Sequence, residues 1–501
     1  MKIDTKNIDI FEFQKEISID NPANIFQKLR KKNSPNFLLE SRSIDPIYGR
    51  MSLIGVDPIL EFRGKNDAVE IRILNPRGKS FFEKFLPAIS KFSDEIAEKT
   101  PEKIILKIAK NDDFLPENQK TKRRNIAQIL RQFLDFFAAK TETIFGLFGA
   151  FSYDFARLFE NLPEILPDEK AVPDFHFFCF DTFVRFDLIR EKAEILCFRN
   201  SEKAAKMAAE NLFQKIKSEK KSTKNVFQID RISCDTEKNK FENLVEKARD
   251  LAAAGELFEI VFSRKFFGNF SGDPFLLYEK YREKNPAPYL FFFDFGNSQL
   301  VGASPEMMVR VERGKAHLRP ISGTAARGDD PISDHENELN LLKSEKERAE
   351  LDMLIDLGRN DLKRVCERGI EIVKYRHVEK YSAVMHTIAH LTGKLKPEFS
   401  ALDALIACQS AGTLTGAPKV AAMIEIEKHE TSRRGFYGGS IGYLTFSGEM
   451  DTGIIIRAAH FQKEKFEFRV GATLLHDSDP RAEFLETENK ARALLNLFRE
   501  K

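Results

Sequence analysis

The chain has 501 residues, of which 42% are hydrophobic and 31% charged, a balance typical of a water-soluble protein with a packed core. Its 79 basic and 77 acidic residues leave a net charge of +2, which gives no electrostatic signature of nucleic-acid or membrane-surface binding. No apolar run is long enough to cross a bilayer, the N-terminus is acidic and interrupted by charges, and the five cysteines form no C-x-x-C pair. We therefore expect a cytoplasmic protein with neither nucleic acid nor membrane as a partner.

The first part of the chain predicts short strands separated by charged loops. Residues 36–62 have the pattern strand, turn, strand, whereas residues 92–125 are polar and lysine-rich and predict a surface excursion. Residues 145–159 alternate small and aromatic side chains and look buried. Residues 177–198 predict two strands joined by a charged turn, and residues 200–217 predict a helix.

Residues 217–240 are the best candidate for a linker, because they are highly charged and lack apolar periodicity. Beyond them helical patterns such as "FENLVEKARDLAAAG" alternate with strand patterns such as "PYLFFFDF" and with glycine-rich turns. This mixture predicts an α/β mixed (α+β) fold.

Two E-x-x-E pairs lie in segments with helical spacing, Glu347 with Glu350 and Glu483 with Glu486. Residues three apart share one face of a helix, where like charges repel unless water or a cation compensates. Two such helices facing one point would form an oxygen-rich site suited to Mg²⁺. The pattern is also common on solvated helices, so by itself it is a weak signal.

Other motifs leave alternatives open. His386 and His390 are four residues apart in "HTIAH", a spacing that could bind a metal, but no third ligand is evident and packed histidines are the simpler interpretation. The stretch 408–423 predicts a glycine-rich turn, then a helix whose first N–H groups attract anions. Arg457, after an apolar strand, should meet a carboxylate, either in a structural salt bridge or on a ligand.

Nucleophilic hydrolase chemistry has little support. The one G-x-S-x-G match, around Ser440, is followed by the strand pattern "IGYLTF", whereas a nucleophile elbow needs a helix at that point.

Seven segments occur in one order between residues 302 and 495: "GASPEMMVRV", "RPISGTAARG", "ERAELDMLIDLGRNDLKRVCERG", "EKYSAVMHTIAHLTG", "AGTLTGAPKVAAM", "RRGFYGGSIGYLTFSGEMDTGIIIR" and "DSDPRAEFLETENKARALL". Together they resemble the chorismate-utilising enzymes, most closely the anthranilate synthase component I family. The resemblance is dense over residues 240–501 and includes "LLES" and "GLFGAFSYDFARLFE" nearer the N-terminus. A series of seven ordered motifs is far more specific than any single match.

The resemblance implies a fold and a division of the chain. The fold would be two facing antiparallel β-sheets with helices outside. Residues 1–235 would carry regulatory segments intertwined with the catalytic body, and residues 236–501 would form the chorismate-binding catalytic domain.

The resemblance also assigns roles to single residues. Mg²⁺ would be held by Glu350 and Glu486, with Glu347 and Glu483 beside them. Glu306 matches the general acid that protonates the departing ring hydroxyl, a role for which a positioned proton donor is valuable. His386 matches a catalytic histidine associated with loss of the enolpyruvyl group. The residues matching substrate contacts are Tyr437 and Arg457, at the enolpyruvyl carboxylate, and Gly323, Thr324, Thr413, Gly471 and Lys490.

Two positions distinguish reactions among the relatives that the resemblance implies. Ser322 stands where aminodeoxychorismate synthases carry a lysine that attacks the ring, and a serine without an adjacent base is a much weaker nucleophile. Glu259 stands where isochorismate synthases carry lysine and most anthranilate synthases carry glutamine. We expect Glu259 to act in catalysis by hydrogen bonding ammonia or ammonium near the ring. Thr473 is a further departure, since many members have glycine there.

The implied reaction converts chorismate and ammonia to anthranilate and pyruvate, the first step of tryptophan synthesis, with Mg²⁺ as cofactor. Glutamine would supply the ammonia through a separate glutamine amidotransferase subunit (component II), so we expect a hetero-oligomer. An L-tryptophan inhibitor site would be formed by Glu40, Ser41, Arg50, Pro288, Tyr289, Leu290 and Tyr443. The alternatives are a 2-amino-2-deoxyisochorismate synthase of a secondary pathway and a non-catalytic regulator that binds chorismate or tryptophan.

Overall fold

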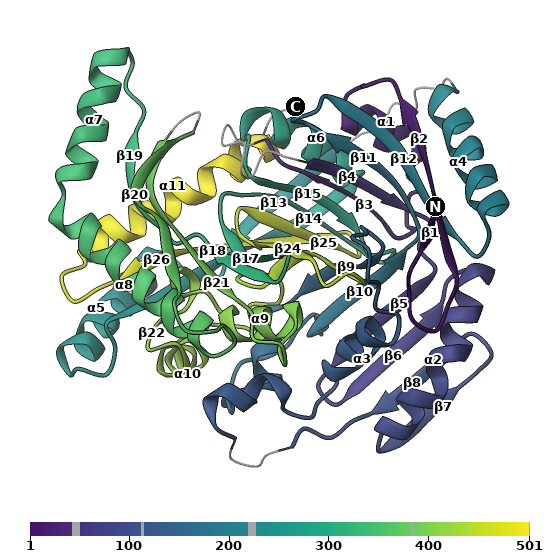
Figure 1. The fold of residues 1–501 in the computed structure, drawn as a ribbon. Coiled ribbons are helices and arrows are strands. Elements are labelled where there is room, and N and C mark those ends of the chain that lie inside the picture. Colours follow the sequence, from purple (N-terminus) through teal and green to yellow (C-terminus); the bar gives the residue numbers. More distant parts are fainter. Residues whose placement is uncertain (43–50, 112–114, 219–226, 382–383, 500–501) are drawn as a thin grey trace.

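The computed structural model describes residues 1–501 except 43–50, 112–114, 219–226, 382–383 and 500–501. Two antiparallel sheets of thirteen strands each face one another, with helices on their outer sides (Figure 1). This arrangement confirms the fold that the sequence resemblance implied.

The first sheet runs in spatial order through β1 (Lys2–Ile3), β2 (Ile10–Ile17), β12 (Lys192–Arg199), β11 (Thr182–Asp187), β4 (Met51–Val56), β3 (Asn36–Glu40), β15 (Tyr289–Asp294), β16 (Ser298–Ser304), β25 (Ala458–Gln462), β26 (Lys465–Leu474), β14 (Glu259–Gly272) and β13 (Phe227–Cys234), with β22 (Gly416–Ala417) paired to β14.

The second sheet runs through β19 (Ile321–Ala326), β21 (Val384–Lys394), β18 (Lys315–Leu318), β17 (Met307–Glu312), β24 (Met450–Ile454), β23 (Ser440–Thr445), β9 (Gly146–Phe151), β10 (Phe175–Phe180), β5 (Leu60–Lys65), β6 (Ala68–Ile73), β8 (Lys103–Lys107) and β7 (Glu95–Lys99), with β20 (Glu371–Lys380) paired to β21.

The α-helices are α1 (Pro22–Leu29), α2 (Lys79–Phe92), α3 (Gln128–Phe136), α4 (Glu202–Lys217), α5 (Lys238–Ala253), α6 (Pro274–Lys284), α7 (Pro331–Lys343), α8 (Glu345–Lys363), α9 (Ala401–Cys408), α10 (Lys419–His429) and α11 (Pro480–Arg499). Short 3₁₀ helices are η1 (Pro76–Gly78), η2 (Glu117–Lys122), η3 (Tyr153–Leu158) and η4 (Gly412–Leu414). Among the described residues, no helix has the length and apolarity needed to span a bilayer.

Each sheet combines strands from early and late in the chain. In the first sheet β3 pairs with β15, placing Glu40 opposite Leu290, and in the second β9 pairs with β23, placing Phe148 opposite Tyr443. The two seams are joined by hydrogen bonds along whole strands, so the early strands cannot separate from the late ones without breaking both sheets. The division at residue 235 stays a prediction.

Phenylalanine, used 46 times in the sequence, fills the space between the sheets. Phe37 of the first sheet stacks on Phe148 of the second, with ring centroids 4.9 Å apart, and on its neighbour Phe293 at 5.5 Å. All three rings are fully or almost fully buried. Such ring pairs add packing energy beyond the area that they bury, so these residues fix the distance between the sheets.

Several predicted elements are confirmed, including the buried strand in residues 145–159, the helix after residue 200 and the helix start after Pro418. The surface excursion 92–125 was only partly right, because β7 and β8 extend the second sheet there. The alternating pattern of β8 explains this: Ile104 and Leu106 point into the core, while Lys103, Ile105 and Lys107 on the other face are only half-buried.

Two further predictions were wrong. Residues 177–198 contain parts of three strands, because the chain crosses from the second sheet to the first at Asp181, whose carboxylate binds Arg77 and Arg199. The proposed linker contains β13, which pairs with β14 at the edge of the first sheet. Its described part is therefore structured despite its charge.

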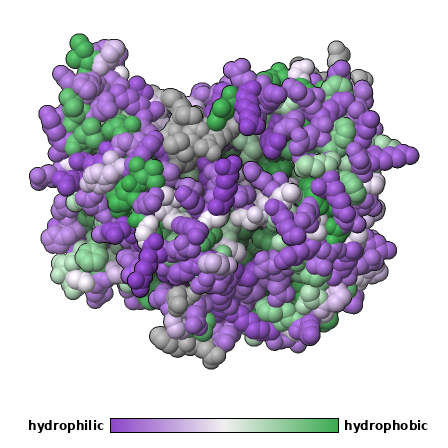
Figure 2. Space-filling view, in the orientation of Figure 1, coloured by the Kyte–Doolittle hydropathy of each residue, from purple (hydrophilic) through white to green (hydrophobic). Residues whose placement is uncertain are grey.

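Hydrophilic side chains dominate the face of the molecule that Figure 2 shows, as expected for a surface in contact with water. Hydrophobic patches interrupt it, one of them at the upper left where α7 lies, and α7 carries the exposed side chains Ile332 and Leu339.

Candidate active site

Two helices carry the four acidic residues of the E-x-x-E pairs. Ser344 caps α8 by accepting a hydrogen bond from the Glu347 amide, and Leu351, Leu354 and Ile355 turn toward β19 and β21. Glu347 and Glu350 stand four residues before Leu351 and Leu354, so they lie on the same face of α8 and their carboxylates also point toward β19, beside Gly323 and Ser322. Helix α11 packs on β26.

The acidic side chains of the two helices influence one another electrostatically. Burial raises the pKa of Glu350, and the nearby Glu486 charge raises it further. Burial likewise raises the pKa of Glu347, with contributions from Glu350 and Glu486, and that of Glu483, with a contribution from Glu486. The two helices thus bring their carboxylates within range of mutual repulsion, as the sequence predicted.

The carboxylates do not converge on one point, however. Within the described parts of the chain, no three or more His, Cys, Asp or Glu side chains form a group that could hold a metal ion. Three of the four acids have a neighbour of their own: Lys490 Nζ lies 2.6 Å from Glu486, Ser322 Oγ donates to Glu350 at 3.2 Å and Ser478 Oγ donates to Glu483 at 2.8 Å. The structure thus places the four acids as one pair on each helix, and their joint role as a metal site stays a prediction.

The donor set nevertheless fits a hard divalent cation. Carboxylate oxygens are the ligands that Mg²⁺ prefers, and a cation would relieve the repulsion between the pairs. Glu483 Oε2 is buried and has no hydrogen-bond partner among the described residues, an arrangement that is costly without a compensating charge or donor. The carboxylate oxygens of the four residues therefore suit Mg²⁺ as ligands.

The segment 319–328 forms the edge strand β19, and its backbone passes close to these acids. Gly323 has a φ of +75°, and a Cβ there would lie 2.8 Å from Glu347 Oε2 and 3.0 Å from Thr387 Oγ1. Only glycine combines that conformation with that approach. The side chain of Ser322 reaches Glu350, while Thr324 is exposed beside it.

Glu306 follows β16 and is almost completely buried. Its Oε1 accepts a hydrogen bond of 2.8 Å from Thr413 Oγ1, which belongs to η4. Burial raises the pKa of Glu306 to about 7, against the opposing influence of Thr413 and the Lys490 charge. A carboxyl with such a pKa can deliver a proton near neutral pH, as a general acid must.

His386 lies on β21, so the helix spacing considered for His386 and His390 does not apply: the two histidines share one face of a strand. His386 Nδ1 lies 2.9 Å from the Gly323 carbonyl oxygen, which can only accept, so Nδ1 carries the proton and Nε2 is left as the basic nitrogen. Burial lowers the pKa of His386, which favours this neutral form. His390 Nε2 lies 3.1 Å from His317 Nδ1.

The remaining predicted substrate contacts lie around the same centre. Gly471 on β26 permits the close approach of Tyr437, because a Cβ at Gly471 would lie 2.8 Å from the tyrosine hydroxyl. Lys490 donates to the Gly471 carbonyl at 2.9 Å. Arg457 is half-buried and has no ion-pair partner among the residues that the structure describes, so the structural salt bridge considered from the sequence is not found there. A half-buried guanidinium without a described ion-pair partner is suited to binding an anionic ligand.

Glu259 is 3% exposed at the start of β14, and its Oε1 has no hydrogen-bond partner within the described chain. Burial raises its pKa to about 7, and the charge of Glu350 adds to the shift. This carboxyl is therefore part of the same electrostatic centre, and it has an oxygen available for a ligand that donates hydrogen bonds.

A cavity of about 950 Å³ lies at the seams where early and late strands join, and it contains none of the predicted catalytic residues. Six of the seven residues predicted for an inhibitor site line it: Glu40, Ser41, Pro288, Tyr289, Leu290 and Tyr443. The seventh, Arg50, lies outside the described residues. The sequence-based grouping of distant segments is thus reproduced in space.

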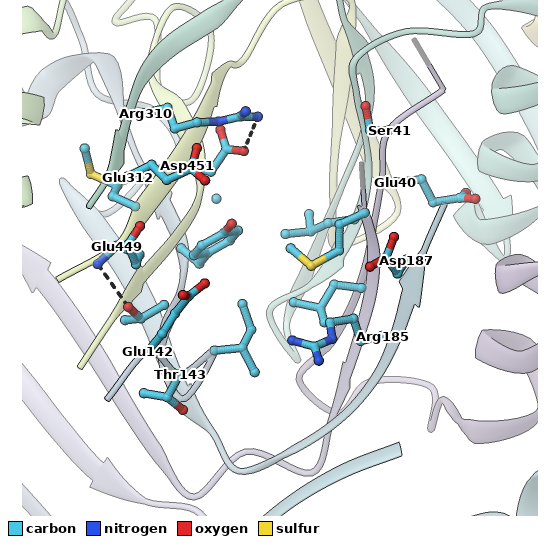
Figure 3. Close-up of a pocket in the computed structure, with 18 of the residues that line it drawn as sticks. Glu40, Ser41, Glu142, Thr143, Arg185, Asp187, Arg310, Glu312, Glu449 and Asp451 are labelled. Carbon is cyan, nitrogen blue, oxygen red and sulfur yellow. Dashed lines mark hydrogen bonds and ion pairs between the residues drawn. The ribbon is translucent and has the colours of Figure 1, made fainter. Parts of the chain in front are cut away.

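Figure 3 shows how these side chains are arranged. The carboxylate of Glu40 points away from the cavity, where Arg282 binds it through two hydrogen bonds of 2.7 and 2.6 Å. Ser41 Oγ is buried and has no hydrogen-bond partner among the described residues. Arg310 and Asp451, which sequence analysis did not identify, form a 2.6 Å ion pair in the opposite wall. Nothing local in the sequence marks that pair, because its members are joined only by the pairing of β17 with β24.

Comparison with known proteins identifies the family of the chain. The family model described as chorismate binding enzyme matches residues 80–496. The chain is 33% identical to "Anthranilate synthase component 1" of Aquifex aeolicus over 98% of this chain and 95% of that one, and 34% identical to the protein of the same name from Cereibacter sphaeroides over 95% and 91%. A crystal structure of anthranilate synthase component I from Streptococcus pneumoniae superposes with a TM-score of 0.70 at 30% identity, covering 89% of this chain and 92% of that one. The chain belongs to the family of chorismate-binding enzymes.

Proposed function

We propose that this protein is the large component of an anthranilate synthase, which aminates chorismate with ammonia and eliminates pyruvate in a reaction requiring Mg²⁺. The observation that carries the proposal is the buried acid Glu306, held by Thr413 and within range of the Lys490 charge. The full-length similarity to proteins named anthranilate synthase component 1 supports the same reaction.

The residues divide the reaction between them. Glu306 donates a proton to the departing ring hydroxyl, which leaves as water while ammonia forms a bond to the ring. His386 Nε2 then takes a ring proton as the bond from the ring to the enolpyruvyl oxygen breaks, which makes the ring aromatic. The released enolpyruvate takes up a proton at its methylene carbon and becomes pyruvate. Arg457 and Tyr437 bind the enolpyruvyl carboxylate, for which a guanidinium offers two parallel hydrogen bonds. Gly323, Thr324 and Gly471 line the ring with backbone and small side chains.

Glu350 and Glu486 would hold Mg²⁺, with Glu347 and Glu483 in support. Bound there, the ion would supply positive charge to fix the substrate's ring carboxylate among groups that would otherwise repel it. The protein's own part is to present carboxylates from two helices and to keep Lys490 beside Glu486.

Ser322 and Glu259 favour ammonia as the attacking group. The Ser322 hydroxyl donates to the Glu350 carboxylate and makes no hydrogen bond to a described histidine or lysine that could activate it. The Glu259 oxygen that lacks a partner can accept a hydrogen bond from ammonia or ammonium at the ring.

We further propose two partners. A separate glutaminase subunit would deliver ammonia, as the "component 1" in the names of the relatives implies, and the cavity beside β3 and β15 would bind L-tryptophan as a feedback inhibitor. The Ser41 hydroxyl in the cavity wall, which has no hydrogen-bond partner among the described residues, supports a ligand with polar groups as well as an aromatic ring.

The test is product identification from the purified chain with chorismate, ammonium and Mg²⁺. We expect anthranilate and pyruvate in equal amounts, and no product when glutamine replaces ammonium in the absence of a partner subunit. Accumulation of 2-amino-2-deoxyisochorismate without pyruvate would instead assign the chain to the alternative reaction. No consumption of chorismate would leave only the binding role.

A further inference from the structure

A buried guanidinium beneath the site connects several of its segments. The side chain of Arg434 is 1% exposed and pairs with Glu430, whose side chain is fully buried, through bonds of 2.6 and 3.1 Å. Its remaining N–H groups donate to the backbone carbonyls of Leu414, at 2.5 Å, and Val261, at 2.6 Å. One side chain thus joins β14, the loop around η4 and the end of α10.

Each segment that Arg434 contacts carries or adjoins a proposed site residue. Leu414 follows Thr413, whose hydroxyl holds Glu306. Val261 lies two residues after Glu259, on the same face of β14. The Arg434 guanidinium also lies 5.7 Å from the ring centroid of Tyr437. Arg434 therefore contacts the segments that position Glu306 and Glu259, and it also lies beside the ring of Tyr437.

The network is polar, although well-packed apolar side chains at the same place would give at least as much stability. Burial disfavours the charged guanidinium, but the Glu430 carboxylate outweighs it and raises the pKa of Arg434. Glu430 is itself bound by the backbone and hydroxyl of Ser263 and by Arg469, so its charge is fully compensated. Buried ion pairs add little net stability compared with well-packed apolar groups, whereas their directional bonds fix geometry.

We propose that Arg434 is a positioning residue for catalysis, which sets the distance between the Thr413–Glu306 pair and the Tyr437 ring through its bonds to Leu414 and Val261. This inference rests on the proposed function of Glu306 as general acid. Arg434 touches neither the substrate nor a reacting atom, so it acts only through these segments.

The variant that tests it is Arg434→Met, which keeps the length of the side chain and removes every bond. The matched control is Arg30→Met: Arg30 is also buried, pairs with Asp273 and lies over two aromatic rings, at 4.5 Å from Phe275, far from the proposed site residues in its contacts. We expect kcat to fall about tenfold to a hundredfold in Arg434→Met, as for other displacements of about 1 Å, with KM for chorismate changed less. Arg30→Met should lose a similar amount of stability while the folded enzyme keeps its kcat.

A double-mutant cycle with Thr413→Val separates positioning from general destabilisation. If Arg434 acts through Thr413, the second substitution should reduce kcat by much less in the Arg434→Met background than in the wild type. Additive effects, an unchanged kcat in Arg434→Met, or an equal loss in Arg30→Met would each overturn the proposal. Should Arg434→Met fail to fold, Arg434→Lys provides the same comparison, since lysine keeps the charge but cannot bind both carbonyls and Glu430 at once.

Amide hydrogen exchange gives a readout that needs no turnover. The turn at η4 is closed by backbone bonds from Leu414 and Thr415 to Ala411. We expect faster exchange in residues 411–415 of Arg434→Met and no change there in Arg30→Met. Unchanged exchange would contradict the positioning role of Arg434 even if the wild type made anthranilate. Faster exchange would support that role even if the wild type made none, so failure of this proposal can be distinguished from failure of the proposed function.

Discussion

Thr413 Oγ1 donates a 2.8 Å hydrogen bond to Glu306 Oε1, joining residues 107 positions apart in the chain. The bond holds a buried carboxyl with one oxygen occupied and the other available. Because the pKa of this carboxyl is raised to about 7, it can be protonated before substrate arrives and still release its proton to a leaving group. Thr413 therefore positions the carboxyl group of Glu306, which supplies the proton.

Glu306→Gln should abolish proton donation while preserving shape and the acceptor oxygen for Thr413. We expect kcat to fall by about a hundredfold to ten-thousandfold, the usual contribution of general acid catalysis, with chorismate still bound. Steady-state fluorescence of anthranilate measures kcat, and calorimetry measures chorismate binding. An unchanged kcat would remove Glu306 from the mechanism.

The same substitution should stabilise the fold at alkaline pH. The pKa of Glu306 is raised from its usual 4.5 to about 7, so its contribution is fully favourable below pH 4.5 and is lost as pH rises through 7. Glu306→Gln removes that cost, which corresponds to at most about 3 kcal/mol. We expect a higher unfolding midpoint than the wild type at pH 8 and little difference at pH 5. The exposed Glu256→Gln is the control, and a gain independent of pH would contradict the assignment.

Glu350→Gln and Glu486→Gln should each weaken Mg²⁺ binding. Removal of one carboxylate takes away both a ligand and the charge that a divalent cation neutralises. We expect the Mg²⁺ concentration for half-maximal activity to rise at least about tenfold, and calorimetric titration of the ion to show the same shift. Glu345→Gln, in the exposed first turn of α8, should behave as wild type. Unaltered Mg²⁺ affinity in both variants would exclude this pair as the metal site.

Ser41→Ala should weaken L-tryptophan binding in the cavity at the strand seams. Ser41 Oγ is buried without a described partner and lines the cavity, so a ligand would satisfy it. Loss of one neutral hydrogen bond predicts a Kd about threefold to tenfold higher by calorimetry. Ser52→Ala is the control, since Ser52 is a buried serine of β4 that does not line the cavity. If wild-type protein showed no heat of binding, the inhibitor site would be refuted.

The sequence predicted the helical acids well because their periodicity is local. Leu351, Leu354 and Ile355 recur at helical spacing, which predicts the helix. Glu347 and Glu350 stand four residues before two of them, so their shared face follows without tertiary information. What it could not predict was the distance between α8 and α11, which depends on how both helices rest on different sheets. In the structure the four acids lie as two pairs, in which Glu486 contacts Lys490 and Glu350 contacts Ser322, and their convergence on one ion stays a prediction.

Strands buried on both faces were harder to identify. Residues 385–391 of β21 are almost all buried, so no alternation distinguishes strand from helix around His386 and His390. In β13 a register shift between Ile229 and Ile232 interrupts the alternation, which made a paired edge strand look like a linker. Only the Glu430–Arg434 pair of the Arg434 network is local in the chain, because Val261 lies 173 residues away.

The most direct test of the central claim is a paired assay of anthranilate and pyruvate from chorismate, ammonium and Mg²⁺, in the wild type and in Glu306→Gln. The account predicts equal amounts of the two products in the wild type and almost none of either in the variant. Pyruvate without anthranilate, or equal product from both proteins, would contradict it.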